Sequence, residues 1–293
     1  MSERWRVWFA ATRPRTLTAG FAPVAVGSAL AQGDTVFHLA SAGAALTGAL
    51  GIQIACNFAN DLFDARKGAD TDERLGPTRA VASGLISARA MLIATVLVVV
   101  LVVVPSVTVL ALRAGWPFIV LGGVSVACAI LYTASGWSIA YHGLGELFAF
   151  LFFGPIAVAG TYAAQALSWS WLSVIAGIGC GCLAAALIGV NNLRDEATDR
   201  AANKRTLAVR CGVPFARVEY VAFLAAAALA AVALAWLTDR WWCVNAGVSL
   251  LLLVPASRSV LAGSQGRPLN GVLAATGAAI LMYGVLLSIG LNL

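Results

Sequence analysis

Long apolar runs alternate along this chain with short segments that carry charge. The run from 91 to 112, MLIATVLVVVLVVVPSVTVLAL, contains no charged residue. As a helix rising about 1.5 Å per residue, it is long enough to cross the ~30 Å hydrocarbon core of a bilayer. A barrel strand would instead alternate polar with apolar side chains, so the pattern predicts membrane-spanning helices. Nine candidate spans show it, at residues 17–33, 38–60, 91–112, 117–134, 144–164, 171–192, 216–237, 242–257 and 271–291.

The composition supports the same class of protein. Hydrophobic residues make up 60% of the 293 positions and charged residues only 11%, whereas a soluble domain carries about 25% charged residues. Stretches of small residues such as CLAAALIGV suit helices that pack closely in lipid. We therefore expect an all-α, polytopic membrane protein in which residues 1–293 form a single integral membrane domain.

The basic residues fall almost entirely on one side of the predicted membrane. With the N-terminus inside, every Lys and Arg except Arg113 and Arg240 lies in a segment on the cytoplasmic side. Because Lys and Arg concentrate in cytoplasmic loops, this asymmetry sets the orientation. The net charge of +6 then needs no nucleic-acid partner, since this bias and attraction to anionic lipid account for it. The Arg-rich, Ala-rich composition indicates a bacterium, and hence the cytoplasmic (inner) membrane.

Acidic residues gather in two short windows, each at the cytoplasmic end of a predicted span. Helix spacings of three, four and seven residues place side chains on one helix face. In the first window, NFANDLFD, these spacings relate Asn57, Asn60, Asp61 and Asp64. In the second window, NNLRDEATD, Asn191, Asp195 and Asp199 share one face. Asp70, Asp72 and Glu73 follow closely after the first window, and Glu196 lies within the second.

The two windows are separated by four predicted spans. An even number of spans places both windows on the same side of the membrane. A parallel internal repeat would give this arrangement, with four-helix units at 17–134 and 144–257 followed by a ninth helix at 271–291. Converging carboxylates near lipid are costly unless a cation offsets their charge. Oxygen ligands from Asp and Asn suit Mg²⁺, and the Lys and Arg residues that follow each window suit a diphosphate. The pattern thus predicts a site for magnesium and a diphosphate.

Both windows resemble the aspartate-rich motifs of the UbiA superfamily, the intramembrane aromatic prenyltransferases. The most similar branch acts on 1,4-dihydroxy-2-naphthoate in menaquinone biosynthesis. ANDLFDARKGADTDERLGPTRAVASGLIS resembles the first motif and loop of this branch, and NNLRDEATDRAANKRTLAVRCG resembles its second motif. TRPRTLTAGFAPVAVGSALA is similar to its opening helix, and YHGLGELFAFLFFGPIAVAGTY to its fifth. The resemblance covers residues 11–211.

The resemblance implies a UbiA-type fold of nine helices around a central cavity, with Mg²⁺ as cofactor. It implies transfer of a polyprenyl group from an allylic polyprenyl diphosphate to dihydroxynaphthoate, with loss of CO₂ and diphosphate, to give a demethylmenaquinone. The implied metal ligands are Asn60, Asp61, Asp64, Asp195 and Asp199; these four aspartates and Tyr132, near the reacting carbon, would form the catalytic set. The implied diphosphate contacts are Asn57, Lys67, Arg79, Arg194, Lys204 and Arg210. The implied contacts to the aromatic acceptor are Tyr141, Glu146 and Asn192.

One segment departs from that branch and leaves the acceptor open. Residues 134–140, ASGWSIA, contain no Lys or Arg where the branch usually has a basic residue; His142 or Arg194 could compensate. 4-Hydroxybenzoate and homogentisate are alternative acceptors, although the loop KGADTDERLGPTR argues against both. A secondary transporter is the alternative from another class, since duplicated units with acidic motifs would fit one. The charge-poor spans and the placement of both windows at one face favour the enzyme, and the residues indicate no obligate protein partner.

Overall fold

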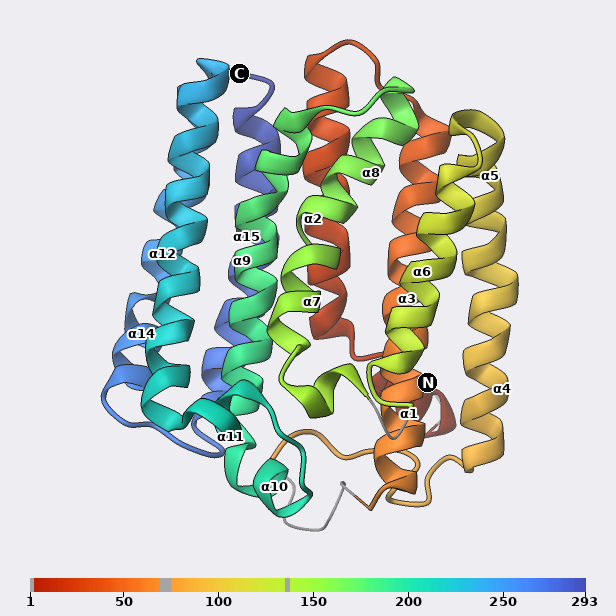
Figure 1. Cartoon of the computed structure of the whole chain (residues 1–293), viewed down its shortest axis with the longest axis vertical. Coiled ribbons are helices and arrows are strands. Elements are labelled where there is room, and N and C mark those ends of the chain that lie inside the picture. Colours follow the sequence, from red (N-terminus) through yellow and green to blue (C-terminus); the bar gives the residue numbers. More distant parts are fainter. Residues whose placement is uncertain (1–2, 69–74, 135–137) are drawn as a thin grey trace.

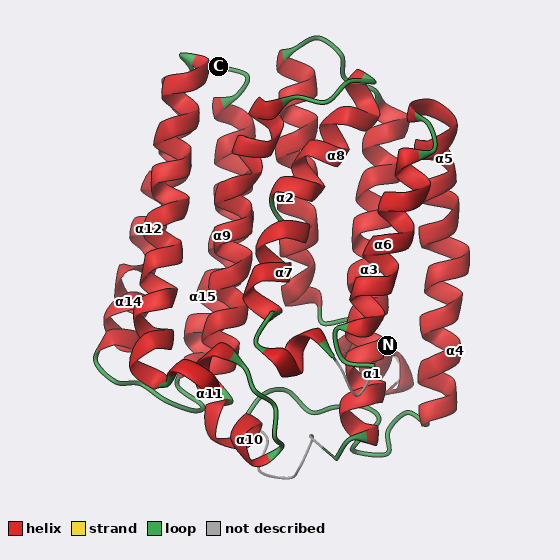
Figure 2. Ribbon diagram, in the orientation of Figure 1, coloured by secondary structure: helices red, strands yellow, loops and turns green. Residues whose placement is uncertain are grey.

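The computed structural model of the protein describes residues 3–68, 75–134 and 138–293. Within these ranges every regular element is helical and no strand occurs (Figure 2), which confirms the all-α class. In chain order the elements are α1 (Glu3–Ala11), α2 (Pro14–Gly33), α3 (Leu39–Arg66), α4 (Ala88–Val98), η1 (Val99–Val103), α5 (Val104–Ala114), α6 (Pro117–Leu131), η2 (Ile139–His142), α7 (Gly145–Phe152), α8 (Pro155–Ala166), α9 (Trp171–Arg194), α10 (Glu196–Ala201), α11 (Leu207–Cys211), α12 (Val213–Thr238), η3 (Trp241–Cys243), α13 (Val244–Ser249), η4 (Leu250–Leu253), α14 (Val254–Leu261) and α15 (Leu269–Gly290).

Seven helices in the described ranges are long and apolar enough to cross a membrane, whereas the sequence predicted nine spans. The two that fall short are α2 and α6. The Thr, Gly, Ser and Gln residues of α2 lower its hydropathy, and α6 has only 15 residues. Both nevertheless stand beside the longer helices in the bundle (Figure 1). The chain is therefore a multi-pass membrane protein, and each predicted span corresponds to a helical segment.

The helices form one bundle in which α9 and α3 are the main packing centres. α9 packs against α7, α8, α12 and α15, and α3 packs against α2, α4, α5 and α6. Both helices end at the same side of the bundle, where α10, α11 and the N-terminal helix α1 also lie (Figure 1). The C-terminus lies at the opposite side (Figure 1). The two acidic windows thus share one end of the bundle, as the sequence predicted.

Proline residues account for two irregularities in the long helices. The π-helix η1 ends two residues before Pro105, at the junction of α4 and α5. A proline inside a helix lacks a backbone donor and clashes with the preceding turn, and a wider π-turn relieves both problems. The second irregularity is the break between α7 and α8, where Gly154 precedes Pro155.

The break at Gly154 brings the chain against α9 at very short range. A Cβ atom on Gly154 would lie 2.6 Å from the carbonyl oxygen of Gly177 and 2.6 Å from the Cα atom of Gly181. A Cβ atom on Gly181 would in turn collide with the carbonyl oxygen of Phe150. Only glycine leaves room for backbones this close, as in other membrane helix contacts. This contact fixes α7 against α9, and both helices contribute side chains to the site described below.

Exposed tryptophans mark the boundary of the bundle opposite the acidic windows. They occur where α5 meets α6, where α8 meets α9 and where α12 ends, at Trp116, Trp169, Trp171, Trp241 and Trp242. Tryptophan is enriched where a membrane protein meets the lipid–water interface. On the other boundary, α1 exposes Trp5 and Phe9. The aromatic residues therefore frame an apolar band between the two ends.

The contact between α7 and α9 generates a stability prediction. The substitution Gly181→Ala should lower the midpoint of thermal unfolding in detergent, since overpacking of this kind costs about 1–3 kcal/mol. The matched control is Gly123→Ala in α6, where a Cβ atom would meet nothing within 4 Å. The control should leave the midpoint unchanged or slightly raised. Equal midpoints for the two variants would contradict the close contact.

Candidate functional site

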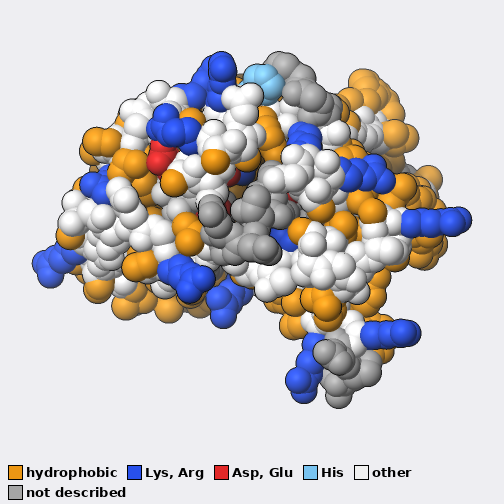
Figure 3. Space-filling model, turned by 90° about the horizontal axis from the view of Figure 1, so that it is seen from below, with side chains coloured by type: hydrophobic (Ala, Val, Ile, Leu, Met, Phe, Trp, Pro, Cys, Tyr) orange, Lys and Arg blue, Asp and Glu red, His pale blue; other side chains and the backbone are white. Residues whose placement is uncertain are grey.

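The end of the bundle that holds α10 and α11 buries its acidic side chains. Lys and Arg side chains spread over this face, whereas few acidic side chains reach its surface (Figure 3). Asp61 is 3% exposed, and Asp64 and Asp199 are each 7% exposed. A buried carboxylate is costly unless it is paired or hydrogen-bonded. The partners of these carboxylates therefore define the site.

Asp64, in the last turns of α3, lies between a cation and a phenol. Its Oδ2 atom accepts a hydrogen bond from Nη2 of Arg79 at 3.2 Å, and both side chains are buried. Its Oδ1 atom accepts a hydrogen bond from the hydroxyl of Tyr141 at 3.3 Å. The first motif is thus tied to the segment between α6 and α7, although Tyr141 is 77 residues away in sequence.

Asp61 holds the loop that follows the first motif. Its two carboxylate oxygens accept hydrogen bonds from the backbone N–H groups of Ala80 and Val81, at 3.0 and 2.9 Å. These bonds place the turn that contains Arg79 next to Asp64. A carboxylate offers about four lone-pair sites, so these two bonds leave Asp61 further acceptor capacity.

The two asparagines of the first motif face different neighbours. Asn57 donates to the carbonyl oxygen of Thr12 at 2.9 Å and to the hydroxyl of Thr16 at 3.1 Å, at the junction of α1 and α2. Asn60 accepts a hydrogen bond from the hydroxyl of Thr133 at 2.8 Å. The structure therefore directs Asn57 to the α1–α2 junction and Asn60 to the end of α6, where Tyr132 lies.

In the second motif, Arg194 and Asp195 form a fork-to-fork pair. Nε and Nη2 of Arg194 donate to the two oxygens of Asp195, at 2.8 and 2.5 Å. Nη2 also donates to Oδ1 of Asn191 at 2.9 Å, and Nη1 donates to Oδ1 of Asn270 at 2.9 Å. Bidentate pairs of this type fix geometry as well as charge. Asp195 is consequently held in one orientation at the end of α9.

Asp199 pairs with Lys204 in the loop after α10. Nζ of Lys204 donates to Oδ1 of Asp199 at 3.2 Å, and Oδ2 of Asp199 is buried without a partner among the described residues. Burial raises the pKa of Asp199 to about 6; Lys204 opposes this shift, and Asp195 and Asp64 add to it. Burial alone would lower the pKa of Lys204, but Asp199, Asp64 and Asp195 together raise it. The two motifs are thus close enough for their charges to interact.

Tyr141 lies where the two motifs meet. Nζ of Lys67 lies 4.1 Å from the centre of its ring, and Nζ of Lys204 lies 5.9 Å from it. Lys67 also donates to the carbonyl oxygen of Thr133 at 2.6 Å and to the hydroxyl of Ser138 at 3.1 Å. Cations over an aromatic face are stabilised by the ring quadrupole. Two ammonium groups, one from each motif, therefore share one aromatic ring.

Backbone contacts hold the Tyr141 segment against the second motif. The N–H group of Arg205 donates to the carbonyl oxygen of Tyr141 at 3.1 Å, and Nη1 of Arg210 donates to that of His142 at 3.0 Å. Arg210 thus lies at this end of the bundle, bonded to η2. His142 itself bonds to the carbonyl oxygen of Ser138 through Nδ1 at 2.9 Å.

The predicted acceptor residues Glu146 and Asn192 contact each other in the interior. Nδ2 of Asn192 donates to Oε1 of Glu146 at 2.7 Å, and Oε2 of Glu146 is buried without a partner among the described residues. A Cβ atom on the neighbouring Gly145 would lie 2.8 Å from the hydroxyl of Tyr132. The structure therefore brings Tyr132, Glu146 and Asn192 together at the junction of α6, α7 and α9.

The donor atoms present suit Mg²⁺ in type, although they form no dense acidic cluster. Within the described ranges, no three His, Cys, Asp or Glu side chains lie close enough together to hold a metal ion. Magnesium does not require such a cluster, because it keeps several waters and binds through one or two carboxylates together with substrate phosphates. The unpartnered Oδ2 atom of Asp199 and the nearby carboxylates of Asp64 and Asp195 offer all-oxygen donors of this kind.

Part of the predicted site lies outside the described residues. This applies to Asp70, Asp72, Glu73 and Arg74 in the loop after the first motif, and to residues 135–137 in the segment that departs from the family pattern.

Sequence reasoning missed Asn270, in the first turn of α15. Its Oδ1 atom accepts from Arg194, and its Nδ2 atom donates to the carbonyl oxygen of Leu75 at 3.0 Å. One amide thus links the second motif to the loop of the first motif, 195 residues earlier in the chain. A single asparagine at the start of an apolar helix gave no signal, because nothing in its neighbourhood repeats the motif pattern.

The fold and the site together define the class of protein. The protein is an all-helical membrane bundle in which carboxylates, lysines and arginines from two motifs meet at one end, close to an apolar interior.

The comparison with known proteins then places the chain within that class. A family model described as "UbiA prenyltransferase family" matches residues 20–273. The chain belongs to the UbiA prenyltransferase family.

Individual relatives support this membership. A 1,4-dihydroxy-2-naphthoate octaprenyltransferase of Mycobacterium tuberculosis is 37% identical over 278 residues, covering 95% of this chain and 94% of that protein. An Escherichia coli protein of the same name is 37% identical over 220 residues, covering 73% of this chain and 71% of its own length. In fold, the chain is similar to a UbiA homologue from Archaeoglobus fulgidus bound to DMAPP and Mg²⁺, with a TM-score of 0.65 at 15% identity; the match covers 96% of this chain and 99% of that one.

The Asn270 bridge generates a prediction about the loop after the first motif. Asn270→Ala removes both hydrogen bonds, so amide hydrogen exchange in the segment 75–86 should accelerate, because exchange reports local opening. The matched control is Asn292→Ala, which removes another cross-helix amide bond of the C-terminal segment, to the carbonyl oxygen of Ala29 at the opposite end. Unchanged protection of 75–86 in Asn270→Ala would show that Asn270 does not hold the loop.

Proposed function

We propose that this protein transfers a polyprenyl group from an allylic polyprenyl diphosphate to 1,4-dihydroxy-2-naphthoate. Carbon dioxide and diphosphate leave, and the product is a demethylmenaquinone, a step of menaquinone biosynthesis. The observation that carries the proposal is the meeting of both acidic motifs and their lysines around Tyr141, in a chain whose relatives bear the name of this activity.

The donor's diphosphate is proposed to bind among the cations at this meeting point. Lys67 and Lys204 face the ring of Tyr141, Arg79 faces Asp64, and Arg210 lies beside η2. Arg194 has five N–H donors, of which four are used on protein acceptors in the described residues. It is therefore proposed chiefly to orient Asp195, with one donor left for the diphosphate.

Magnesium dependence is part of the proposal. Asp64, Asp195 and Asp199, together with Asn60 and Asp61, are the residues that would hold the ion. When bound, Mg²⁺ offsets the negative charge that collects on a departing diphosphate. Asp61 contributes by fixing the backbone of Ala80 and Val81, which sets the position of Arg79.

The apolar interior is proposed to protect the allylic group. A partly open pocket of about 140 Å³ lies among α2, α3, α5, α6, α7 and α8, and Gln53, one turn before Asn57, lines it. Exclusion of water prevents capture of an allylic cation before the aromatic carbon attacks. Tyr132 is proposed to face this cation with its ring, and Glu146, Asn192 and Tyr141 are proposed to orient the acceptor. The site is proposed to face the cytoplasm from a bacterial inner membrane, as the Lys and Arg asymmetry indicates.

A prenyl-transfer assay on the purified protein tests the reaction. With Mg²⁺ and a radiolabelled polyprenyl diphosphate, 1,4-dihydroxy-2-naphthoate should give a lipid product that EDTA abolishes. 4-Hydroxybenzoate and homogentisate, supplied separately, should give none. If product formed with only one of these two acceptors, that compound would replace 1,4-dihydroxy-2-naphthoate as the proposed acceptor, and prenyl transfer would remain the proposed reaction. Absence of product with every acceptor, in protein that binds Mg²⁺, would favour a transporter.

Neutralising one carboxylate in either motif should by itself reduce enzyme activity. Asp64→Asn and Asp195→Asn should each lower kcat by at least about 100-fold, the usual loss when one transition-state charge contact is removed. The matched control is Glu196→Gln, which neutralises a carboxylate paired with exposed Arg200 on α10. It should retain activity. Near-normal activity of either aspartate variant, confirmed as folded by its unfolding midpoint, would remove that residue from the site.

A further inference from the structure

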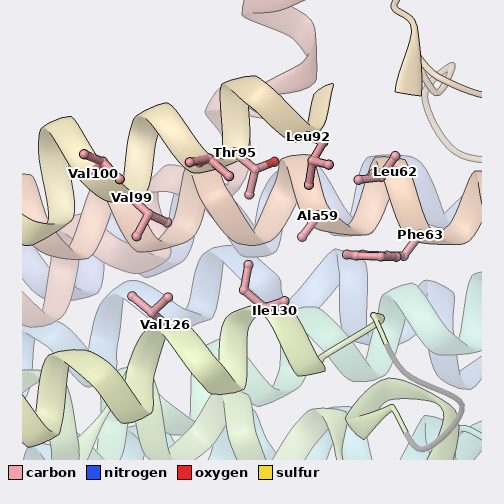
Figure 4. A pocket seen from close by; sticks show the side chains of 10 residues that line it. Ala59, Leu62, Phe63, Leu92, Thr95, Val99, Val100, Val126 and Ile130 are labelled. Carbon is pink, nitrogen blue, oxygen red and sulfur yellow. The ribbon is translucent and has the colours of Figure 1, made fainter. Parts of the chain in front are cut away.

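An apolar groove of about 240 Å³ lies on the outer side of α3, away from the site. α3 forms its floor, and α4, η1 and α6 form its walls (Figure 4). Ala59 and Phe63 come from α3, Leu92 comes from α4, and Val126 and Ile130 come from α6. The one polar lining residue, Thr95, satisfies its hydroxyl within its own helix, on the carbonyl oxygen of Met91 at 2.9 Å. The groove therefore offers no polar group to a ligand along its length.

The groove is distinct from the site, although both use the end of α3. Ala59 and Phe63 point away from Asp61 and Asp64 around α3, because at 100° per residue the midpoints of the two pairs lie about 150° apart. The groove also opens outward. Leu92, Val96 and Val100 line it, and their side chains are 41%, 51% and 51% exposed.

Two arginines continue the rows of α3 and α4 side chains that line the groove. They lie at the end of the groove nearest the site. Arg66 lies one helical turn beyond Phe63, with its guanidinium carbon 5.7 Å from the centre of the Phe63 ring. Arg89 lies one turn before Leu92 on α4. Both are exposed, and neither has an ion-pair partner in the part of the chain that the structure describes. The groove is thus apolar along its length and cationic at one end.

The length of the groove fits one leaflet of a membrane. From Leu92 to Val100 the wall helix advances about 12 Å, and one leaflet of the ~30 Å hydrocarbon core spans about 15 Å. Arg66 ends α3 and Arg89 begins α4, so both belong to the end of the bundle whose exposed Lys and Arg side chains Figure 3 shows. Basic side chains at a membrane surface attract anionic lipid headgroups.

We propose that this groove binds one anionic phospholipid. An acyl chain lies against Phe63, Leu92 and Val126, and the lipid phosphate lies between Arg66 and Arg89. The lipid fills the space between α3, α4 and α6 and ties the start of α4 to the end of α3. The inference is independent of the reaction proposed above, because it concerns the outer face of α3 and its readout is lipid binding.

Native mass spectrometry of the purified full-length protein, titrated with phosphatidylglycerol or phosphatidylcholine, tests the proposal. Wild-type protein should retain one phosphatidylglycerol, and phosphatidylcholine should bind at least tenfold more weakly. The double variant Arg66→Gln/Arg89→Gln should weaken phosphatidylglycerol binding at least tenfold. Val96→Trp, which fills the groove from its exposed rim, should do the same without removing a charge. The matched control is Arg258→Gln/Arg267→Gln, which removes two exposed arginines outside the groove; it should bind like wild type.

The contrary outcomes are equally specific. Equal loss in both double variants would show that general surface charge, and not the groove, attracts the lipid. Unchanged binding in Arg66→Gln/Arg89→Gln and in Val96→Trp would remove the groove as the site. If a polyprenyl diphosphate added as a probe bound with the same arginine dependence while phosphatidylglycerol did not, the groove would belong to an isoprenoid diphosphate and the phospholipid assignment would fall.

Discussion

The cost of burying charge at the edge of a membrane governs the arrangement of this site. Asp64, Asp195 and Asp199 are largely withdrawn from solvent, and each is neutralised by an arginine or lysine in hydrogen-bonding contact. An uncompensated carboxylate in such surroundings would destabilise the fold by several kcal/mol. The loop after the first motif must therefore bring a basic side chain to the buried carboxylate of Asp64. Arg79 reaches Asp64 because Asp61 holds the backbone of Ala80 and Val81.

The same pairing shapes the proposed chemistry. The lysines and arginines that neutralise the carboxylates are also the groups proposed to receive a diphosphate. Substrate binding would therefore exchange partners within an assembled set of charges, and the donors would be oriented before the substrate arrives. Preorganised donors of this kind stabilise developing charge without a reorganisation cost. The ring of Tyr141 contacts the ammonium groups of lysines from both motifs.

Much of this could be predicted from the sequence, because strong local patterns produce it. Apolar runs predicted the helical class and the position of each span, although α2 and α6 are less apolar or shorter than a membrane span requires. Helix spacing and the even number of spans predicted that both acidic windows share one end. The bridging role of Asn270 could not be predicted, since it depends on α15 reaching a loop 195 residues earlier. Nor could the attachment of Asn57 to the α1–α2 junction, because helix periodicity shows which side chains share a face but not what that face meets.

The pairs of the second motif have a consequence for how the site is assembled. Arg194 and Asp195 are adjacent, and Asp199 and Lys204 are five residues apart, so both pairs close within one short stretch of chain. Neither pair uses a residue of α12 or α15, so neither depends on those helices for its partner. These pairs neutralise Asp195 and Asp199 without any later helix, whereas Arg205 and Arg210 in the same segment form no ion pair within the described residues and keep the segment positive. Packing of the bundle then adds to the second motif the contacts that come from distant parts of the chain, such as that of Asn270.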